Sequence, residues 1–139
     1  GFFSQFLPDQ QGAANQWVEV RWSAPASMYL HVGAVQGSKE YDKGLVVLAT
    51  HIMTAETEST SHYFYAGRRN WLVDDAQLNA IFLEATLGAF RGEDMPMVAK
   101  VQEAMDGQEL FSLSPVLLTC DMGPIRARRK LAALVAAQG

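Results

Sequence analysis

His51, His62 and Asp94 are the residues whose types and spacing most suggest chemistry. If the chain turns between Glu56 and Thr57, the two histidines are directly opposed on neighbouring strands, on one face, with Cβ atoms roughly 5 Å apart. Together with Asp94 they would form the two-histidine, one-carboxylate set that holds non-haem Fe(II). A change of one residue in the register would send one histidine to the other face.

Simpler interpretations of the same residues remain open. Asp94 precedes Pro96 at an expected break between two helical segments, so it is alternatively the N-cap or first-turn acid of the second segment. His51 and His62 are alternatively partly buried strand residues with hydrogen-bond partners. His31 has no expected role beyond forming part of a pocket wall.

Other reactive or charged residues offer less chemistry. Cys120 is the only cysteine, which excludes an internal disulfide, a cysteine-rich zinc site and an iron–sulfur cluster held wholly by this chain. We expect this thiol to be nearly buried and inert. The basic residues at 126–130 and at 68–69 are expected on solvated faces or in salt bridges to another subunit. The sequence has no glycine-rich phosphate loop, serine nucleophile elbow or metalloprotease helix motif.

Composition restricts the class of protein. The 139 residues suffice for one globular domain, with 49% hydrophobic and 19% charged residues. No apolar run reaches the roughly 18 residues of a membrane span, so no membrane partner is expected. The formal charge of −4 argues against a nucleic-acid partner. No secretory signal opens the chain, which predicts a cytoplasmic protein, and the Gly1 start suggests a cut end.

Four β-rich runs must position the histidines. They are expected at 17–22, 28–36, 45–54 and 61–67, with a solvated loop at 37–44. Short connections between them predict an antiparallel meander.

The hydrophobic period becomes helical after Asn70. Asp74 or Asp75 caps a helix of about four turns, Gly92 weakens it, and Pro96 starts a second helix that ends at Gly107. Residues 108–120 are expected as a loop or short strand. Asp121 then caps a last helix opened by Pro124, whose inward side chains are expected to be Ile125, Leu131, Leu134 and Val135. Strands followed by helices predict an α+β fold, a sheet curved around a helix with a cavity suited to small apolar ligands.

Several motifs together resemble one known family. They are the segment from Ala49 through His51 and His62 to Tyr65, then Arg69-Asn70, Asp74-Asp75, Phe90 to Asp94, and the ending 118–131. In order and spacing they resemble the C-terminal catalytic domain of Rieske non-haem iron oxygenases, in the vanillate demethylase and dicamba monooxygenase branch. The resemblance runs from about Trp22 to the C-terminus.

The resemblance implies a helix-grip, START-like domain in which mononuclear Fe(II) activates O2 beside a small aromatic substrate. Asp94 matches the family's carboxylate ligand. His51 matches a substrate-binding histidine that would donate a hydrogen bond, and Leu30 and Ala85 fall where other pocket residues lie. The family also implies a [2Fe-2S] cluster, NAD(P)H electrons delivered through a reductase or ferredoxin, and a homo-oligomer, commonly a trimer.

This chain departs from the family in what it lacks. The family's two iron-binding histidines and its Rieske cluster ligands lie upstream, so we interpret residues 1–139 as the C-terminal part of such a domain, incomplete at its N-terminus and without a Rieske domain. This also weakens the site formed from His51 and His62. The first hypothesis is therefore the C-terminal catalytic portion of an aromatic-ring or aryl-ether oxygenase, inactive alone and prone to self-association.

Two alternatives remain. The chain could be a free-standing domain that binds small aromatic ligands without catalysis. His51, His62 and Asp94 could also form a metal site within the chain, which would be excluded if the two imidazoles lie on opposite faces of the hairpin.

Overall fold

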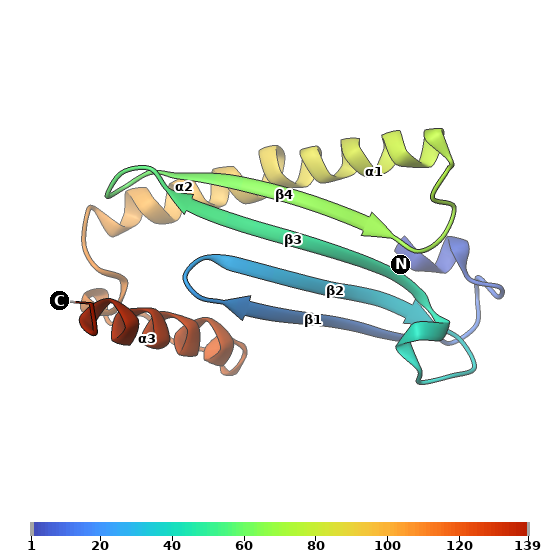
Figure 1. The fold of residues 1–139 in the computed structure, drawn as a ribbon, viewed down its shortest axis with the longest axis horizontal. Coiled ribbons are helices and arrows are strands. Elements are labelled where there is room, and N and C mark those ends of the chain that lie inside the picture. The colour runs from blue at the N-terminus through green and yellow to red at the C-terminus, as the bar shows by residue number, and fades with distance from the viewer. Residues whose placement is uncertain (1, 139) are drawn as a thin grey trace. The chain divides into compact units, whose positions relative to one another are not determined.

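The computed structural model describes residues 2–138 and has an α+β architecture (Figure 1). A sheet formed in the first half of the chain is followed by helices. The strands are β1 (Asn15–Ser23), β2 (Ser27–Val35), β3 (Leu45–Ala55) and β4 (Ser61–Arg69). The longer helical elements are α1 (Ala76–Gly88), the π-helical segment η3 (Ala89–Asp94), α2 (Met95–Met105) and α3 (Met122–Ala136). Short 3-10 turns are η1 (Phe2–Phe6), η2 (Tyr41–Lys43), η4 (Leu110–Leu113) and η5 (Thr119–Asp121).

The chain divides into two compact units. The first comprises Gly1–Val73 and Pro124–Gly139 and contains the sheet and most of α3. The second comprises Asp74–Gly123 and contains α1, η3 and α2.

The sheet is a four-stranded antiparallel meander in the order β1-β2-β3-β4. Alternating apolar and polar residues, many of them β-branched or aromatic, favour this half-buried arrangement. Residues 56–60 connect β3 to β4, and the Thr57 hydroxyl accepts hydrogen bonds from the backbone N–H groups of Ser59 and Thr60 at 3.2 and 3.0 Å. The predicted strands and their meander topology are confirmed.

One face of the sheet is apolar and aromatic, and we call it the His51 face. Because side chains alternate along each strand, the register assigns its members. They are Val18, Val20 and Trp22 on β1; Met28, Leu30, Val32 and Ala34 on β2; Leu45, Val47, Ala49, His51 and Met53 on β3; and Tyr63, Tyr65 and Gly67 on β4.

A hydrophobic core covers one end of the His51 face. The buried side chains of Phe3, Leu7 and Ala34 form it, and Val32, Leu45, Val47, Ala14 and Trp71 pack against them. On the outer strand β1, Val18 and Val20 of the same face remain 70% and 60% exposed. The core therefore anchors η1 on part of this face and leaves the part around His51 for other functions.

The opposite face is organised by Trp17. Its ring lies over Gly33, the residue directly opposite it on β2, and stacks on Tyr41 with centroids 4.2 Å apart and planes 9° apart. Trp17 is only 6% exposed. The 37–44 segment, predicted as a solvated loop, thus includes the η2 turn, which contributes a stacking residue.

The helical unit begins as predicted and then differs from the prediction. The Asp75 carboxylate accepts a hydrogen bond from Leu78 N at 2.9 Å and caps α1. The irregularity expected near Gly92 is the π-helical segment η3, and Pro96 lies in the first turn of a second α-helix, α2, as predicted. The backbone nevertheless stays helical throughout, so α1, η3 and α2 form one continuous helical path. A proline ring clashes with the carbonyl four residues earlier in an α-helix, and the wider π turn just before Pro96 relieves that conflict. The path ends at Asp106 and Gly107, both with positive φ.

The C-terminal expectations were partly wrong. Residues 108–120 include 3-10 turns and no strand. The Asp121 carboxylate accepts from Leu118 N at 2.8 Å, closing η5, and α3 begins at Met122. Ile125 is buried as expected, whereas Leu134 and Val135 are 36% and 61% exposed. Helical periodicity defines a face, but what packs against that face decides how much of it is buried.

The contact between Trp17 and Gly33 predicts that Gly33→Ala destabilises the fold. A Cβ at position 33 would lie 2.2 Å from Trp17 Cζ2 and 2.5 Å from the Leu45 backbone oxygen. We expect the free energy of unfolding to fall by about 1–3 kcal/mol, measured by urea denaturation. The matched control is Gly88→Ala in α1, where a Cβ meets no atom within 4 Å and a gain of up to about 1 kcal/mol is expected. Equal stability of the two variants would contradict the packing described.

Candidate functional site

His51 lies in β3 on the His51 face, directly opposite Met28 on β2 and Tyr65 on β4. Leu30 shares this face and lies one diagonal position away, opposite Ala49. The structure thus brings together two of the residues expected in a substrate pocket. Ala85 is exposed on α1, in the second unit, which also contains Asp94.

Two tyrosines of β4 surround the His51 imidazole. The Tyr63 hydroxyl forms a short hydrogen bond with His51 Nδ1. The Tyr65 ring meets the imidazole edge-on, with centroids 5.2 Å apart and planes at 77°. Gly67 makes room for Tyr65, because a Cβ there would lie 2.7 Å from the Tyr65 hydroxyl oxygen. Sequence analysis did not single out these tyrosines, although the aromatic run of β4 was a visible signal.

The His51 imidazole is half-buried, and its charge state follows from that position. Removal from water disfavours the protonated form and lowers the pKa of His51 from its ordinary value of 6.5. The imidazole is therefore neutral at pH 7, with one nitrogen that donates and one that accepts hydrogen bonds.

His62 lies on the other face of the sheet. It is opposite Thr54, not His51, and its Nε2 is 3.4 Å from the Glu56 carboxylate. The predicted direct pairing of the histidines is wrong because the β3–β4 connection spans residues 56–60 and is not centred between Glu56 and Thr57. Since Thr54 is an odd number of residues from His51, the two imidazoles point to opposite faces.

The three-residue metal site proposed within this chain is therefore wrong. The two imidazoles lie on opposite faces, and in the part of the chain that the structure describes, no three histidine, cysteine, aspartate or glutamate side chains are grouped so as to hold a metal ion.

Asp94 is the last residue of the π-helical segment η3. Its backbone is helical, with φ −68° and ψ −52°, and its side chain makes no capping hydrogen bond. Asp94 thus occupies the N-cap position of α2, as one interpretation expected, but it does not act as a cap, because a capping residue has non-helical torsions and a side chain that accepts from the following turn. It is not a first-turn acid of α2 either. Within residues 2–138 the exposed Asp94 carboxylate also has no ion pair. Such π turns interrupt α-helices frequently at functional sites.

His31 belongs to the opposite face of the sheet from His51. Its Nδ1 lies 3.2 Å from the Glu19 carboxylate, and its ring packs edge-on against Trp17 with centroids 5.6 Å apart. These contacts give it a structural role beside the Trp17 stack.

Residues 69–70 are structural, which sequence analysis missed. Arg69 Nε donates to the Trp71 carbonyl at 2.9 Å. The Asn70 side chain accepts from Val46 N at 2.8 Å and donates to the Gly44 carbonyl at 2.9 Å, so it extends the β3–β4 pairing beyond the end of β4. Cys120 is exposed, which corrects the expectation of a nearly buried thiol.

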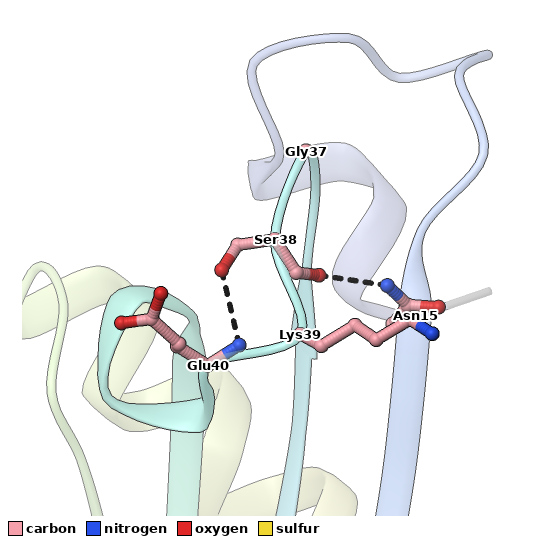
Figure 2. A pocket seen from close by; sticks show the side chains of 5 residues that line it. All are labelled: Asn15, Gly37, Ser38, Lys39 and Glu40. Atoms are coloured by element: carbon pink, nitrogen blue, oxygen red, sulfur yellow. Dashed lines mark hydrogen bonds between the residues drawn. The ribbon is translucent and has the colours of Figure 1, made fainter.

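An open pocket lies at the loop end of the sheet, away from the predicted residues (Figure 2). It has a volume of about 480 Å³ and is lined by Asn15 and residues 37–40. Its polar groups bond to one another: Asn15 Nδ2 donates to the Ser38 carbonyl at 2.7 Å, and Glu40 N donates to the Ser38 hydroxyl at 3.0 Å. These bonds order the loop, and the pocket contains none of the candidate site residues.

Among residues 2–138, no helix is both long and apolar enough to cross a membrane.

Comparison with known proteins identifies the family. The sequence model described as the vanillate O-demethylase oxygenase C-terminal domain matches residues 1–137. The chain belongs to this family, as the motifs predicted.

Two curated relatives are similar over much of the chain. The oxygenase component of chloroacetanilide N-alkylformylase from Rhizorhabdus wittichii (strain DC-6 / KACC 16600) is 34% identical over 137 residues, which cover 99% of this chain and 39% of the relative. The toluene-4-sulfonate monooxygenase system iron-sulfur subunit TsaM1 from Comamonas testosteroni is 32% identical over 94 residues, which cover 63% of this chain and 27% of the relative. The chain thus spans less than half the length of either relative.

Solved structures of dicamba monooxygenase share the fold. The structure bound to 3,6-dichlorosalicylic acid aligns with a TM-score of 0.87 at 24% identity, covering 98% of this chain and 40% of that one. The structure with non-haem iron and dicamba aligns with a TM-score of 0.61 at 24% identity, covering 93% and 41%. The predicted α+β fold, an antiparallel sheet with C-terminal helices, is confirmed.

The lowered pKa of His51 predicts a dependence of stability on pH. When the pH falls below 6.5, the unfolded chain binds a proton at His51 before the folded chain does, so the free energy of unfolding decreases until the folded pKa is passed. We expect an NMR titration to place the pKa of His51 below 6.5. We also expect the free energy of unfolding of His51→Gln to lack this component of the pH dependence. Above about pH 7.5 it should differ from that of the wild type by a constant amount. A His51 pKa at or above 6.5 would contradict the burial described.

Proposed function

We propose that this chain is the C-terminal catalytic portion of the oxygenase component of a Rieske-type oxygenase that acts on an aromatic ring or an aryl ether. The observation that carries the proposal is the family match across residues 1–137. The names of the relatives, which are oxygenase and monooxygenase components, support it, and they favour an oxygenase over a free-standing binding domain.

Asp94 is the residue we propose as an iron ligand. Its carboxylate is exposed, lacks a capping hydrogen bond and lies on a π turn, so its hard anionic oxygen fits one position of a mononuclear Fe(II) site. When bound, Fe(II) would supply the activation of O2. In the part of the chain that the structure describes, no three histidine, cysteine, aspartate or glutamate side chains are grouped so as to hold a metal ion, so we propose that the two histidine ligands come from outside this chain.

The [2Fe-2S] cluster does not fit this chain. Its single cysteine, Cys120, is exposed and cannot supply a cluster's ligand set. The relative named an iron-sulfur subunit supports a cluster elsewhere in the whole protein. Electrons from NAD(P)H would reach it through a reductase or ferredoxin, and the name "oxygenase component" supports such a separate partner.

The role we propose for the His51 face is to bind the substrate. A neutral His51 would donate a hydrogen bond to a polar oxygen of a small aromatic molecule, and Leu30 on the same face would contact its apolar part. Ala85, which the resemblance implies as a further pocket residue, is exposed on α1 and stays a prediction. In this proposal His51 and Leu30 orient the substrate. We also propose that the whole protein is cytoplasmic and forms a homo-oligomer, of the trimer type.

Asp94→Ala in the full-length oxygenase tests the ligand role. We expect the iron content in excess of the cluster to be lost and turnover to fall at least about 100-fold, because a direct ligand matters more than its supporting groups. Metal analysis and product formation are the measurements. Glu93→Gln is the matched control, since Glu93 is an exposed neighbour on the same π turn and should retain iron. Full iron and activity in Asp94→Ala would sink the assignment.

His51→Ala tests the substrate-binding role. Removing a neutral hydrogen bond should raise KM about 3–10-fold with a smaller effect on kcat, as measured by steady-state kinetics. His51→Gln retains an amide donor near the position of Nε2 and should recover part of the loss. An unchanged KM in both variants would contradict the proposal.

A further inference from the structure

The contact between Tyr63 and His51 joins two neighbouring strands. Tyr63 is opposite Met53 and His51 is opposite Tyr65, so Tyr63 approaches His51 diagonally on the same face. Their ring centroids are 5.9 Å apart, and the hydroxyl meets Nδ1 in a short hydrogen bond. The phenol therefore contacts the nitrogen nearer the backbone.

The direction of this hydrogen bond follows from the chemistry of its partners. A phenol is a good donor and a poor acceptor, because its oxygen lone pair is delocalised into the ring. The unprotonated nitrogen of a neutral imidazole is a good acceptor. In the neutral His51 imidazole the favoured arrangement is Tyr63 Oη–H donating to Nδ1, and the imidazole proton then resides on Nε2.

Tyr65 restricts the same imidazole from a second side. Its edge-on contact limits rotation of the imidazole plane, and Gly67 leaves the space that its ring occupies. Tyr65 thus restricts the plane of the imidazole ring, whereas Tyr63 determines which nitrogen is protonated.

We infer that Tyr63 is a positioning residue that holds His51 in the Nε2–H tautomer and thereby selects aromatic substrates that present an acceptor oxygen, such as a carboxylate, a sulfonate or an amide carbonyl. The selection by substrate rests on the proposed function. The tautomer itself does not, because it is a property of the protein without substrate.

The first test is the tautomer in full-length protein labelled with ¹⁵N-histidine. The ¹⁵N shifts of His51, assigned by their absence in His51→Gln, should show a protonated Nε2 and an unprotonated Nδ1. Tyr63→Phe retains the ring and removes the donor, so the two nitrogens should shift toward an averaged pattern. Tyr29→Phe is the matched control: Tyr29 lies in the same sheet on the opposite face, and the pattern should not change.

The second test is kinetic, with vanillate as the carboxylate-bearing probe. Tyr63→Phe should raise KM about 3–10-fold with kcat within about twofold, whereas a structural defect would lower the thermal midpoint and reduce both parameters. A protonated Nδ1 in the wild type, or an unchanged ¹⁵N pattern in Tyr63→Phe, would overturn the inference. If the ¹⁵N pattern depends on Tyr63 but the protein shows no oxygenase turnover, the positioning role of Tyr63 is upheld. In that case it is the proposed function that is overturned.

Discussion

The register between β3 and β4 is the constraint on which the arrangement of the His51 face depends. Their connection at 56–60 sets His51 opposite Tyr65 and brings Tyr63 to the imidazole along the diagonal. Side chains alternate with a period of two, so a slip of one residue would move the β4 tyrosines to the other face. The same register sends His62 to the opposite face, and the register between β2 and β3 places Leu30 diagonally beside His51. One set of backbone hydrogen bonds therefore decides which residues can share a binding surface.

The π turn has a comparable role in the helical unit. A continuous helix through residues 76–105 has to accommodate Pro96, which lacks an N–H and clashes with α-helical geometry. The wider turn of η3 resolves that conflict, and Asp94 is its last residue. The carboxylate is consequently free of a capping role, which is the state that a metal ligand requires. The π turn that accommodates Pro96 therefore also contains Asp94, the proposed metal ligand.

The residues proposed for binding and for metal ligation lie in different parts of the chain. The sheet offers a neutral, half-buried imidazole held by two tyrosines, which is suited to orienting a polar oxygen. The helical unit contains Asp94, whose carboxylate is the one proposed to complete a metal site with ligands from elsewhere. The family membership supports the proposed function, and the chain spans less than half the length of its relatives.

The sequence by itself determined the α+β class, the four strands, a helix cap at Asp74 or Asp75, and the family. These depend on local periodicity, capping chemistry and short motifs in order. Residue type and spacing singled out His51, His62 and Asp94, and the family motifs then favoured His51 and Asp94. Only the tertiary structure decided which side chains meet: it separated His51 from His62, joined His51 to Tyr63, and showed that Asp94 ends a π turn without making a capping hydrogen bond. The physical reason is that the length of the loop between two strands sets their register. A shift of one residue in that register moves every side chain of a strand to the other face of the sheet, and the local sequence pattern is the same for both registers.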